Sequence, residues 1–123
     1  MSDQETTLAE LRELVRQFVE ARQWRQFHTP KNLSMSLAIE AAELMEHFQW
    51  LTPEESRSVI NVPEKLHEAG EELADVLCYA LALANELDLD VSQAVHAKMI
   101  KNAQKYPAEQ YRGRYGPDDQ RGA

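Results

Sequence analysis

The chain has 123 residues and a formal net charge of -8 at pH 7. This length suits one domain with a modest core. The acidic balance argues against a protein that binds a nucleic-acid polymer or a membrane surface, because such partners attract basic patches. It does not exclude a phosphorylated small molecule, because a bound metal ion can supply positive charge locally.

The cysteine content and the amino-terminal residues both bear on the cellular compartment of the protein. Cys78 is the only cysteine, so no intramolecular disulfide can form, and we expect it to be a small buried side chain. The stretch that follows Met1 is acidic and lacks the apolar region of a signal peptide. No apolar run reaches the length of a membrane span. The sequence therefore predicts a cytoplasmic protein.

Helix caps and proline positions divide the chain into helices, and no stretch favours a strand. The T-x-x-E box at Thr7 and the Thr-Pro pairs at Thr29 and Thr52 are typical helix starts. The expected helices run from Thr7 towards Trp24 or Phe27, from Pro30 to near Trp50, from Pro53 to about Val59, from about Pro63 to Leu87, and from Asp90 to near Tyr106. The predicted fold is an all-α bundle of about four main helices.

Apolar residues cover more of the two central helices than a lone small bundle can bury. We therefore expect a homodimer or homotetramer. Residues 1–107 are predicted to form the domain. Residues 108–123, rich in Gly, Arg, Asp and Pro, are predicted to be a C-terminal arm or a disordered tail.

Two stretches of the chain carry an acidic stripe on a largely apolar helix. At about 100° per residue, one stripe consists of Ser36, Glu40, Glu43 and His47, and the other of Glu68, Glu72, Asp75 and Tyr79. A buried carboxylate costs several kcal/mol unless it is paired or bound to a metal. Each stripe therefore needs a partner, either in salt bridges or in a shared metal site.

A shared metal site is the interpretation that the matched pairs favour. If the two helices pack together, four carboxylates converge, those of Glu40, Glu43, Glu72 and Asp75. Carboxylate-only ligation favours Mg²⁺, or Mn²⁺, over zinc or iron. A di-iron bundle requires E-x-x-H on two helices, and only the stretch from Glu64 to His67 matches. Because Mg²⁺ sites are usually completed by phosphates, a polyphosphate substrate is expected.

Other polar and aromatic residues are candidates for contacts with such a substrate. Lys98 and Asn102 share a helix face, which, taken alone, is more typical of an ordinary solvated surface. Trp24, Trp50 and Tyr79 are able to stack on a base, and ordinary packing explains each of them as well. His28 is a further substrate-binding candidate that also suits a cap or a surface position.

Several motifs together resemble the all-α NTP pyrophosphatase superfamily, the MazG-like group. The pattern EAAE from Glu40 to Glu43, followed by ELAD from Glu72 to Asp75, is similar to its E-x-x-E…E-x-x-D signature. Further stretches resemble the single-domain dCTP pyrophosphatases of that group: WRQFHTPKNL after residue 23, FQW ending at residue 50, EELADVLCY ending at residue 79, and KMIKNAQKYP after residue 97. The resemblance covers residues 8–107.

This resemblance implies a Mg²⁺-dependent hydrolase that converts a nucleoside triphosphate, dCTP or a modified dCTP, to the monophosphate and pyrophosphate. It implies metal ligands at Glu40, Glu43, Glu72 and Asp75, phosphate contacts at Lys98 and Asn102, and a base pocket formed by Trp24, Trp50 and Tyr79. Glu40 and Glu43 are the catalytic candidates for activating water. The competing hypothesis is a non-catalytic helical interaction protein whose acids form structural salt bridges.

Overall fold

The computed structural model describes residues 1–116 and 118–121, and every regular element in those ranges is helical. The elements in chain order are α1 (Leu8–Ala21), α2 (Pro30–Glu46), α3 (Pro53–Arg57), the 3₁₀ helix η1 (Ser58–Asn61), α4 (Pro63–Glu86), α5 (Val91–Lys105) and α6 (Ala108–Tyr111). The all-α prediction is confirmed. The chain forms two compact units, Met1–Leu89 and Asp90–Ala123.

The predicted helix starts are confirmed by their hydrogen bonds. Thr7 and Thr52 each accept a hydrogen bond from the backbone three residues on, and a glutamate there returns the bond in a capping box. Thr29 caps α2, with Pro30 at its first position. Asp90 caps α5 by accepting from the amide of Gln93 at 2.9 Å. These short polar side chains satisfy amide groups that a helix start leaves without partners.

The first helix ends earlier than predicted, at Ala21, because the chain there adopts a left-handed turn. Gln23 has φ 53°. Its amide donates to the carbonyl of Glu20, and the amide of Trp24 donates to the carbonyl of Val19, both at 3.0 Å. These two bonds form a Schellman motif, which usually contains glycine at the left-handed position. Without that glycine, the sequence offered no stop signal before Trp24.

The predicted end of the second helix was also too late, since α2 stops at Glu46 and a series of turns carries the chain on to Trp50. The long helix α4 runs as predicted and ends in a second Schellman motif at Asp88, which has φ 50°. In that motif the amide of Leu89 donates to the carbonyl of Ala84 at 3.0 Å.

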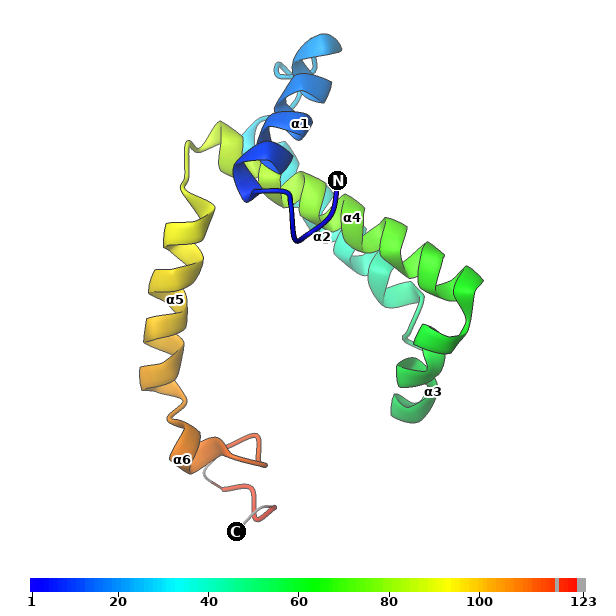
Figure 1. The fold of residues 1–123 in the computed structure, drawn as a ribbon, viewed down its shortest axis with the longest axis vertical. Helices are drawn as coiled ribbons and strands as arrows, with labels where there is room; N and C mark the ends of the chain where they lie inside the picture. The colour runs from blue at the N-terminus through cyan, green and yellow to red at the C-terminus, as the bar shows by residue number, and fades with distance from the viewer. Residues whose placement is uncertain (117, 122–123) are drawn as a thin grey trace. The chain divides into compact units, whose positions relative to one another are not determined.

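Helices α2 and α4 lie side by side in the first unit, and α1 packs against the C-terminal part of α4 (Figure 1). A reciprocal pair of hydrogen bonds fixes this second contact. Arg12 Nε donates to Asn85 Oδ1 at 3.0 Å, and Asn85 Nδ2 donates to the carbonyl of Arg12 at 3.1 Å. The Arg12 guanidinium also donates to the carbonyl of Leu89. Together these bonds hold α1 over the end of α4.

The core of the single chain is small, and much apolar surface is exposed. The buried apolar residues are Val19, Leu33, Val59, Leu81, Ala82 and Ala84. By contrast, Ile39 on α2 and Leu77 on α4 are 59% and 53% exposed. Cys78, which was expected to be buried, is exposed on α4. In the described ranges, no helix combines the length and the apolar character needed to cross a membrane.

Candidate functional site

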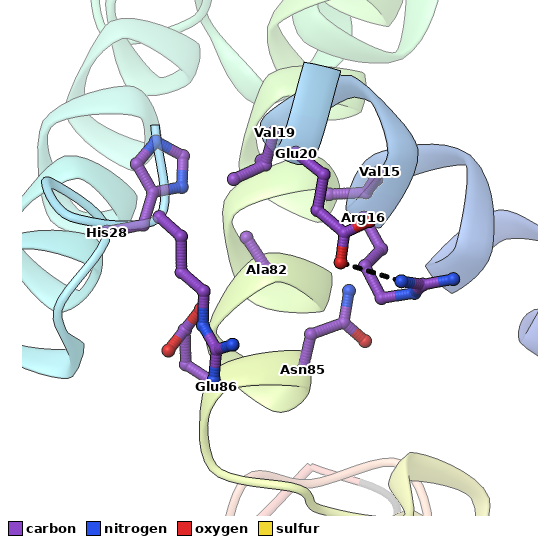
Figure 2. Close-up of a pocket in the computed structure, with 9 residues that line it drawn as sticks. Val15, Arg16, Val19, Glu20, His28, Ala82, Asn85 and Glu86 are labelled. Atoms are coloured by element: carbon purple, nitrogen blue, oxygen red, sulfur yellow. Dashed lines mark hydrogen bonds and ion pairs between the residues drawn. The ribbon is translucent and has the colours of Figure 1, made fainter. Parts of the chain in front are cut away.

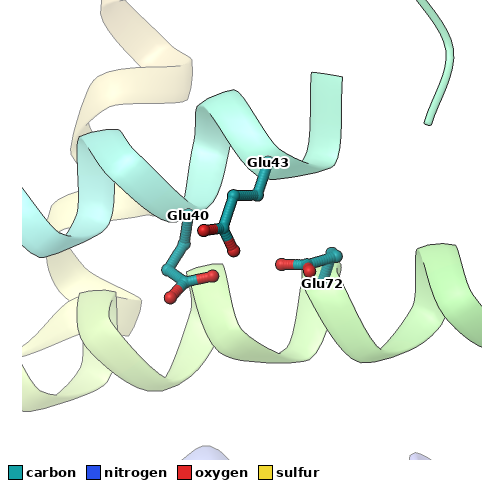
Figure 3. Close-up of side chains that lie close together, drawn as sticks. All are labelled: Glu40, Glu43 and Glu72. Atoms are coloured by element: carbon teal, nitrogen blue, oxygen red, sulfur yellow. The ribbon is translucent and has the colours of Figure 1, made fainter. Parts of the chain in front are cut away.

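Three carboxylates meet between the two central helices. Glu40 and Glu43 come from α2 and Glu72 from α4, and Figure 3 shows their carboxylates turned towards one another. One oxygen from each lies within 4.8 Å of the others. The spacing of three residues places the first two on one face of α2, and the α2–α4 packing brings that face to α4. Glu40 and Glu72 are half-buried.

Two of these carboxylates have an oxygen that is shielded from solvent. Oε2 of Glu40 and Oε2 of Glu72 are both buried, and neither has a hydrogen-bond partner among the described residues. No salt bridge of the described residues involves either side chain. The predicted alternative, in which these acids form structural salt bridges, therefore has no support from the contacts of this cluster.

The electrostatics of the cluster follow from this shielding. Burial raises the pKa of Glu40 to about 7, with further contributions from hydrogen bonds to Glu43 and Glu72 and from the charges of Glu43 and Asp75. Burial disfavours the charged form of a carboxyl group, and nearby negative charges act in the same direction. The cluster thus holds more negative charge than the protein around it neutralises.

Asp75, the fourth predicted metal ligand, lies one turn after Glu72 on α4. It is exposed, and it is not one of the three side chains whose oxygens meet within 4.8 Å. Its charge nevertheless contributes to the raised pKa of Glu40. Asp75 therefore lies at the edge of the acidic cluster, where it also borders a cavity.

That cavity has a volume of about 500 Å³ and lies between α1, the turn after it and α4. It is lined by Leu14, Val15, Phe18, Val19, Trp24, His28, Asp75, Cys78, Tyr79 and Ala82. Its size is within the range of small-molecule pockets, and so is its composition of apolar walls with a few polar groups. Three predicted substrate-binding residues, Trp24, His28 and Tyr79, are thereby brought together beside Asp75.

Aromatic contacts fix the turn that carries Trp24. Its ring meets Phe18 edge to face, with 5.7 Å between the centroids and an angle of 77° between the planes. The ring of His28 lies at 6.3 Å on another side, and the Arg22 guanidinium stacks over Phe18 at 3.6 Å. These contacts hold the indole at the wall of the cavity.

A second, more polar cavity of about 290 Å³ adjoins the first, and the two share Val15, Val19, His28 and Ala82. Figure 2 shows it between α1 and the end of α4, with Glu86 and Asn85 at one side and the ion pair of Arg16 and Glu20 at the other. Sequence reasoning missed Arg25 and Glu86, which form an ion pair of 3.4 Å here. The sequence signal for this pair was the return of polar residues at the end of α4, after its apolar run.

The remaining predicted substrate-binding residues are Trp50 in the first unit and Lys98 and Asn102 in the second. Trp50 is 86% exposed in the turn after α2 and lines neither of the two cavities. Lys98 and Asn102 lie on α5, in the second unit, four residues apart and so on one face of that helix. Lys98 is exposed, and the Asn102 amide donates weakly to the sulfur of Met99 at 3.7 Å.

Comparison with known proteins assigns this arrangement of helices and acids to a family. The family model described as the MazG-like family matches residues 35–115, which include the three carboxylates of the cluster. The chain belongs to the MazG-like family. A solved structure has a similar fold: a pyrophosphatase from Archaeoglobus fulgidus matches with a TM-score of 0.76 and 40% identity, covering 87% of this chain and 98% of that one.

The chain is also similar to curated proteins that are named as pyrophosphatases. The protein named dCTP pyrophosphatase 1 from Mus musculus is 42% identical over 109 residues, which cover 89% of this chain and 64% of the relative. The protein of the same name from Homo sapiens is 42% identical over 104 residues, which cover 85% of this chain and 61% of the relative. The chain thus spans somewhat less than two thirds of the length of these relatives.

Proposed function

We propose that this MazG-like chain is a Mg²⁺-dependent nucleoside triphosphate pyrophosphohydrolase that acts on dCTP or a modified dCTP. The observation that carries the proposal is the meeting of Glu40, Glu43 and Glu72 beside an aromatic cavity. Relatives that bear the name dCTP pyrophosphatase 1 support the choice of substrate. The products would be the nucleoside monophosphate and pyrophosphate.

The donor set of the acidic cluster suits a hard divalent cation. Its ligands are carboxylates alone, as Mg²⁺ or Mn²⁺ prefers. The shielded oxygens of Glu40 and Glu72 lack a partner among the described residues, so a cation bound there would compensate their negative charge. We propose Glu40, Glu43, Glu72 and Asp75 as the residues that hold it. Bound Mg²⁺ would offset negative charge on the phosphates and on the departing pyrophosphate.

The remaining chemical task is to activate water. Hydrolysis forms one P–O bond to the water oxygen, breaks one P–O bond of the bridge between the α and β phosphates, and transfers a proton from water to a base. A base acts best when its pKa lies near the working pH. The pKa of about 7 makes Glu40 a candidate for this base, and Glu43, three residues on, is the second.

The cavity beside the cluster is the proposed nucleoside site. Trp24 and Tyr79 offer aromatic surfaces at its wall, and stacking of a base on such a surface is worth about 1–3 kcal/mol. Trp50 is proposed as a third aromatic contact, which requires that another surface brings it to the base, since it does not line the cavity. Lys98 and Asn102 are proposed phosphate contacts.

A pyrophosphate-release assay across the common ribo- and deoxynucleoside triphosphates, with and without Mg²⁺, tests the proposal. Wild type should release pyrophosphate only with a divalent cation, and dCTP or a 5-substituted dCTP should be the best substrate. Glu43→Gln should lose most of the activity, whereas Glu46→Gln, an exposed acid at the end of the same helix, should keep it. Absence of metal-dependent release from every nucleotide would favour the non-catalytic hypothesis.

A further inference from the structure

The inference concerns the ion pair of Arg25 and Glu86, and it rests on the proposed function. Residues 22–29, here called the α1–α2 turn, join the first two helices and carry Trp24 to the wall of the aromatic cavity. Glu86 is the last residue of α4 and lines the polar cavity (Figure 2). Arg25 Nε lies 3.4 Å from Glu86 Oε1, so the pair joins the turn to the end of α4.

The other polar contacts of the α1–α2 turn are local. The amide of Trp24 donates to the carbonyl of Val19 on α1 at 3.0 Å. The side-chain amide of Asn32 on α2 donates to the carbonyl of Phe27 at 3.0 Å. Among the described residues, no hydrogen bond or other ion pair links this turn to α4. The single ion pair is therefore the polar contact that ties the turn to α4.

Glu86 needs a counterion at its position. Its side chain is only 21% exposed, and it lies at the C-terminal end of α4, where the helix dipole disfavours a carboxylate. The last turn of α4 contains no basic residue. Arg12 reaches this end of the helix, but its guanidinium donates to Asn85 and to the carbonyl of Leu89. The cation that neutralises Glu86 is therefore Arg25, which comes from the α1–α2 turn.

We propose that Arg25 and Glu86 are positioning residues, whose ion pair latches the α1–α2 turn onto α4 and thereby fixes the indole of Trp24 for the nucleoside. Trp24 and Arg25 are adjacent in the chain, and local hydrogen bonds hold the turn together. The position of Arg25 therefore determines the position of Trp24. In this role neither member of the pair contacts the substrate, and both act through the wall of the aromatic cavity.

The expected size of the effect follows from the exposure of the pair. Arg25 is 77% exposed, and ion pairs at such positions contribute little to global stability. Loss of the latch lowers the fraction of molecules in which the turn lies on α4, and the apparent affinity for the nucleotide falls with that fraction. For a pair of this strength, KM for dCTP should rise about twofold to fivefold. The value of kcat should stay close to wild type, because the acidic cluster lies elsewhere on α4 and on α2.

Charge reversal tests whether the two residues act as a pair. Arg25→Glu and Glu86→Arg each bring two like charges together, so each should raise KM for dCTP by about fivefold. The double variant restores an ion pair with the charges exchanged, and its KM should return to within about twofold of wild type. Arg57→Glu, at the exposed end of α3, is the matched control for added negative charge and should leave KM unchanged.

The fluorescence of Trp24 measures its position without turnover. In a Trp50→Phe background, Trp24 is the only tryptophan, and acrylamide quenching without nucleotide reports the exposure of its indole. Quenching should increase in both single charge-reversal variants and return to the background value in the double variant. Thermal stabilisation by Mg²⁺ should be the same in all of these proteins, which excludes damage to the acidic cluster.

The outcomes separate the latch from the proposed function. If wild type hydrolyses nucleotides and the single variants leave both KM and quenching unchanged, the latch is overturned and the proposed function stands. A double variant as impaired as either single variant would also overturn the latch, because the effect would then come from the individual side chains. Wild type that hydrolyses no nucleotide would overturn the proposed function and, with it, the role of the pair in substrate binding.

Discussion

Glu40 and Glu72 face each other between α2 and α4, each with one carboxylate oxygen shielded from solvent and without a donor among the described residues. When both are ionised, the protein buries like charges without compensating them, which destabilises the fold. The same juxtaposition is what a divalent cation requires. The cluster is therefore expected to weaken the metal-free protein and to gain stability when a cation binds.

Replacement of Glu40 by Gln should separate these two effects. The neutral amide removes one buried charge, so Tm of the metal-free protein should rise, by roughly 4 °C for each kcal/mol of relief. The stabilisation that wild type gains from millimolar Mg²⁺ should largely disappear. Thermal denaturation with and without Mg²⁺ measures both effects.

The matched control for that substitution is Glu46→Gln, at the exposed end of the same helix. It should change neither the Tm of the metal-free protein nor its response to Mg²⁺. Equal Mg²⁺ stabilisation in wild type and Glu40→Gln would remove Glu40 from the metal site.

The raised pKa of Glu40 predicts a particular pH dependence. Its pKa is about 7 in the folded protein and near the ordinary 4.5 in the unfolded chain, so the folded state holds the proton more tightly. The contribution of the protonated group to stability is complete below about pH 4.5 and is lost as pH rises through 7. Metal-free wild type should therefore lose stability relative to Glu40→Gln across this window.

Mg²⁺ binding should show the opposite trend, because the cation competes with the proton on Glu40. The affinity of wild type for Mg²⁺ should increase from pH 5.5 to pH 7.5 and then level off. Chemical denaturation at fixed pH values, together with Mg²⁺ titrations, measures both trends. A stability difference between wild type and Glu40→Gln that is constant from pH 4.5 to 7.5 would contradict the assignment.

The sequence predicted those parts of the site that depend on local spacing. The three-residue interval between Glu40 and Glu43 places them on one helix face whatever surrounds the helix. The Thr-Pro pairs at the starts of α2 and α3 likewise depend only on a few adjacent residues, and both predicted helix starts were confirmed. The meeting of the α2 pair with Glu72 could be predicted as well, because two largely apolar helices with matched polar stripes bury their surfaces best against each other.

What could not be predicted depends on how α1 lies on α4. The left-handed residues Gln23 and Asp88 end two helices without the glycine that usually marks such turns. The pairing of Arg25 with Glu86 and the two cavities follow from contacts between residues far apart in the sequence. Trp50, predicted as a pocket residue from its aromatic side chain and from the family resemblance, lies in an exposed turn, and its contact with a base stays a prediction.

Trp24 and Trp50 offer a direct comparison of a cavity aromatic with an exposed one. Trp24→Ala removes a wall of the cavity and should raise KM for the best nucleotide about tenfold to a hundredfold, with a smaller effect on kcat. Trp50→Ala should have an effect of that size only if another surface brings Trp50 to the base. Steady-state kinetics on dCTP and dATP distinguish these outcomes, and an unchanged KM in Trp24→Ala would contradict the nucleoside site.

Apolar residues on the outer faces of the central helices predict self-association. Ile39 and Leu77 are more than half exposed in the single chain, and a large exposed apolar surface usually marks an interface. Light scattering at micromolar concentration should report at least a dimer. Leu77→Asp should shift the protein towards the monomer, whereas Lys31→Asp, an exposed position at the start of α2, should not. A stable monomer in wild type would contradict the prediction.

The reciprocal hydrogen bonds of Arg12 and Asn85 should control the cavities from a distance. Asn85 accepts from Arg12 Nε and donates to the Arg12 carbonyl in a part-buried setting. Removal of a partner from such a pair costs about 1–3 kcal/mol, because the groups left behind have lost their own partners. Asn85→Ala should therefore lower Tm by several degrees and loosen α1 over the cavity that holds Trp24. KM for the nucleotide should rise, while Mg²⁺ stabilisation should persist, because the acidic cluster lies on α2 and the middle of α4.

Asn102→Ala is the control for the loss of an asparagine side chain on a helix, and it should leave the Tm of the first unit unchanged. Hydrogen exchange of the α1 amides measures the loosening directly. If exchange in α1 is as slow in Asn85→Ala as in wild type, then apolar contacts rather than this pair hold α1 in place.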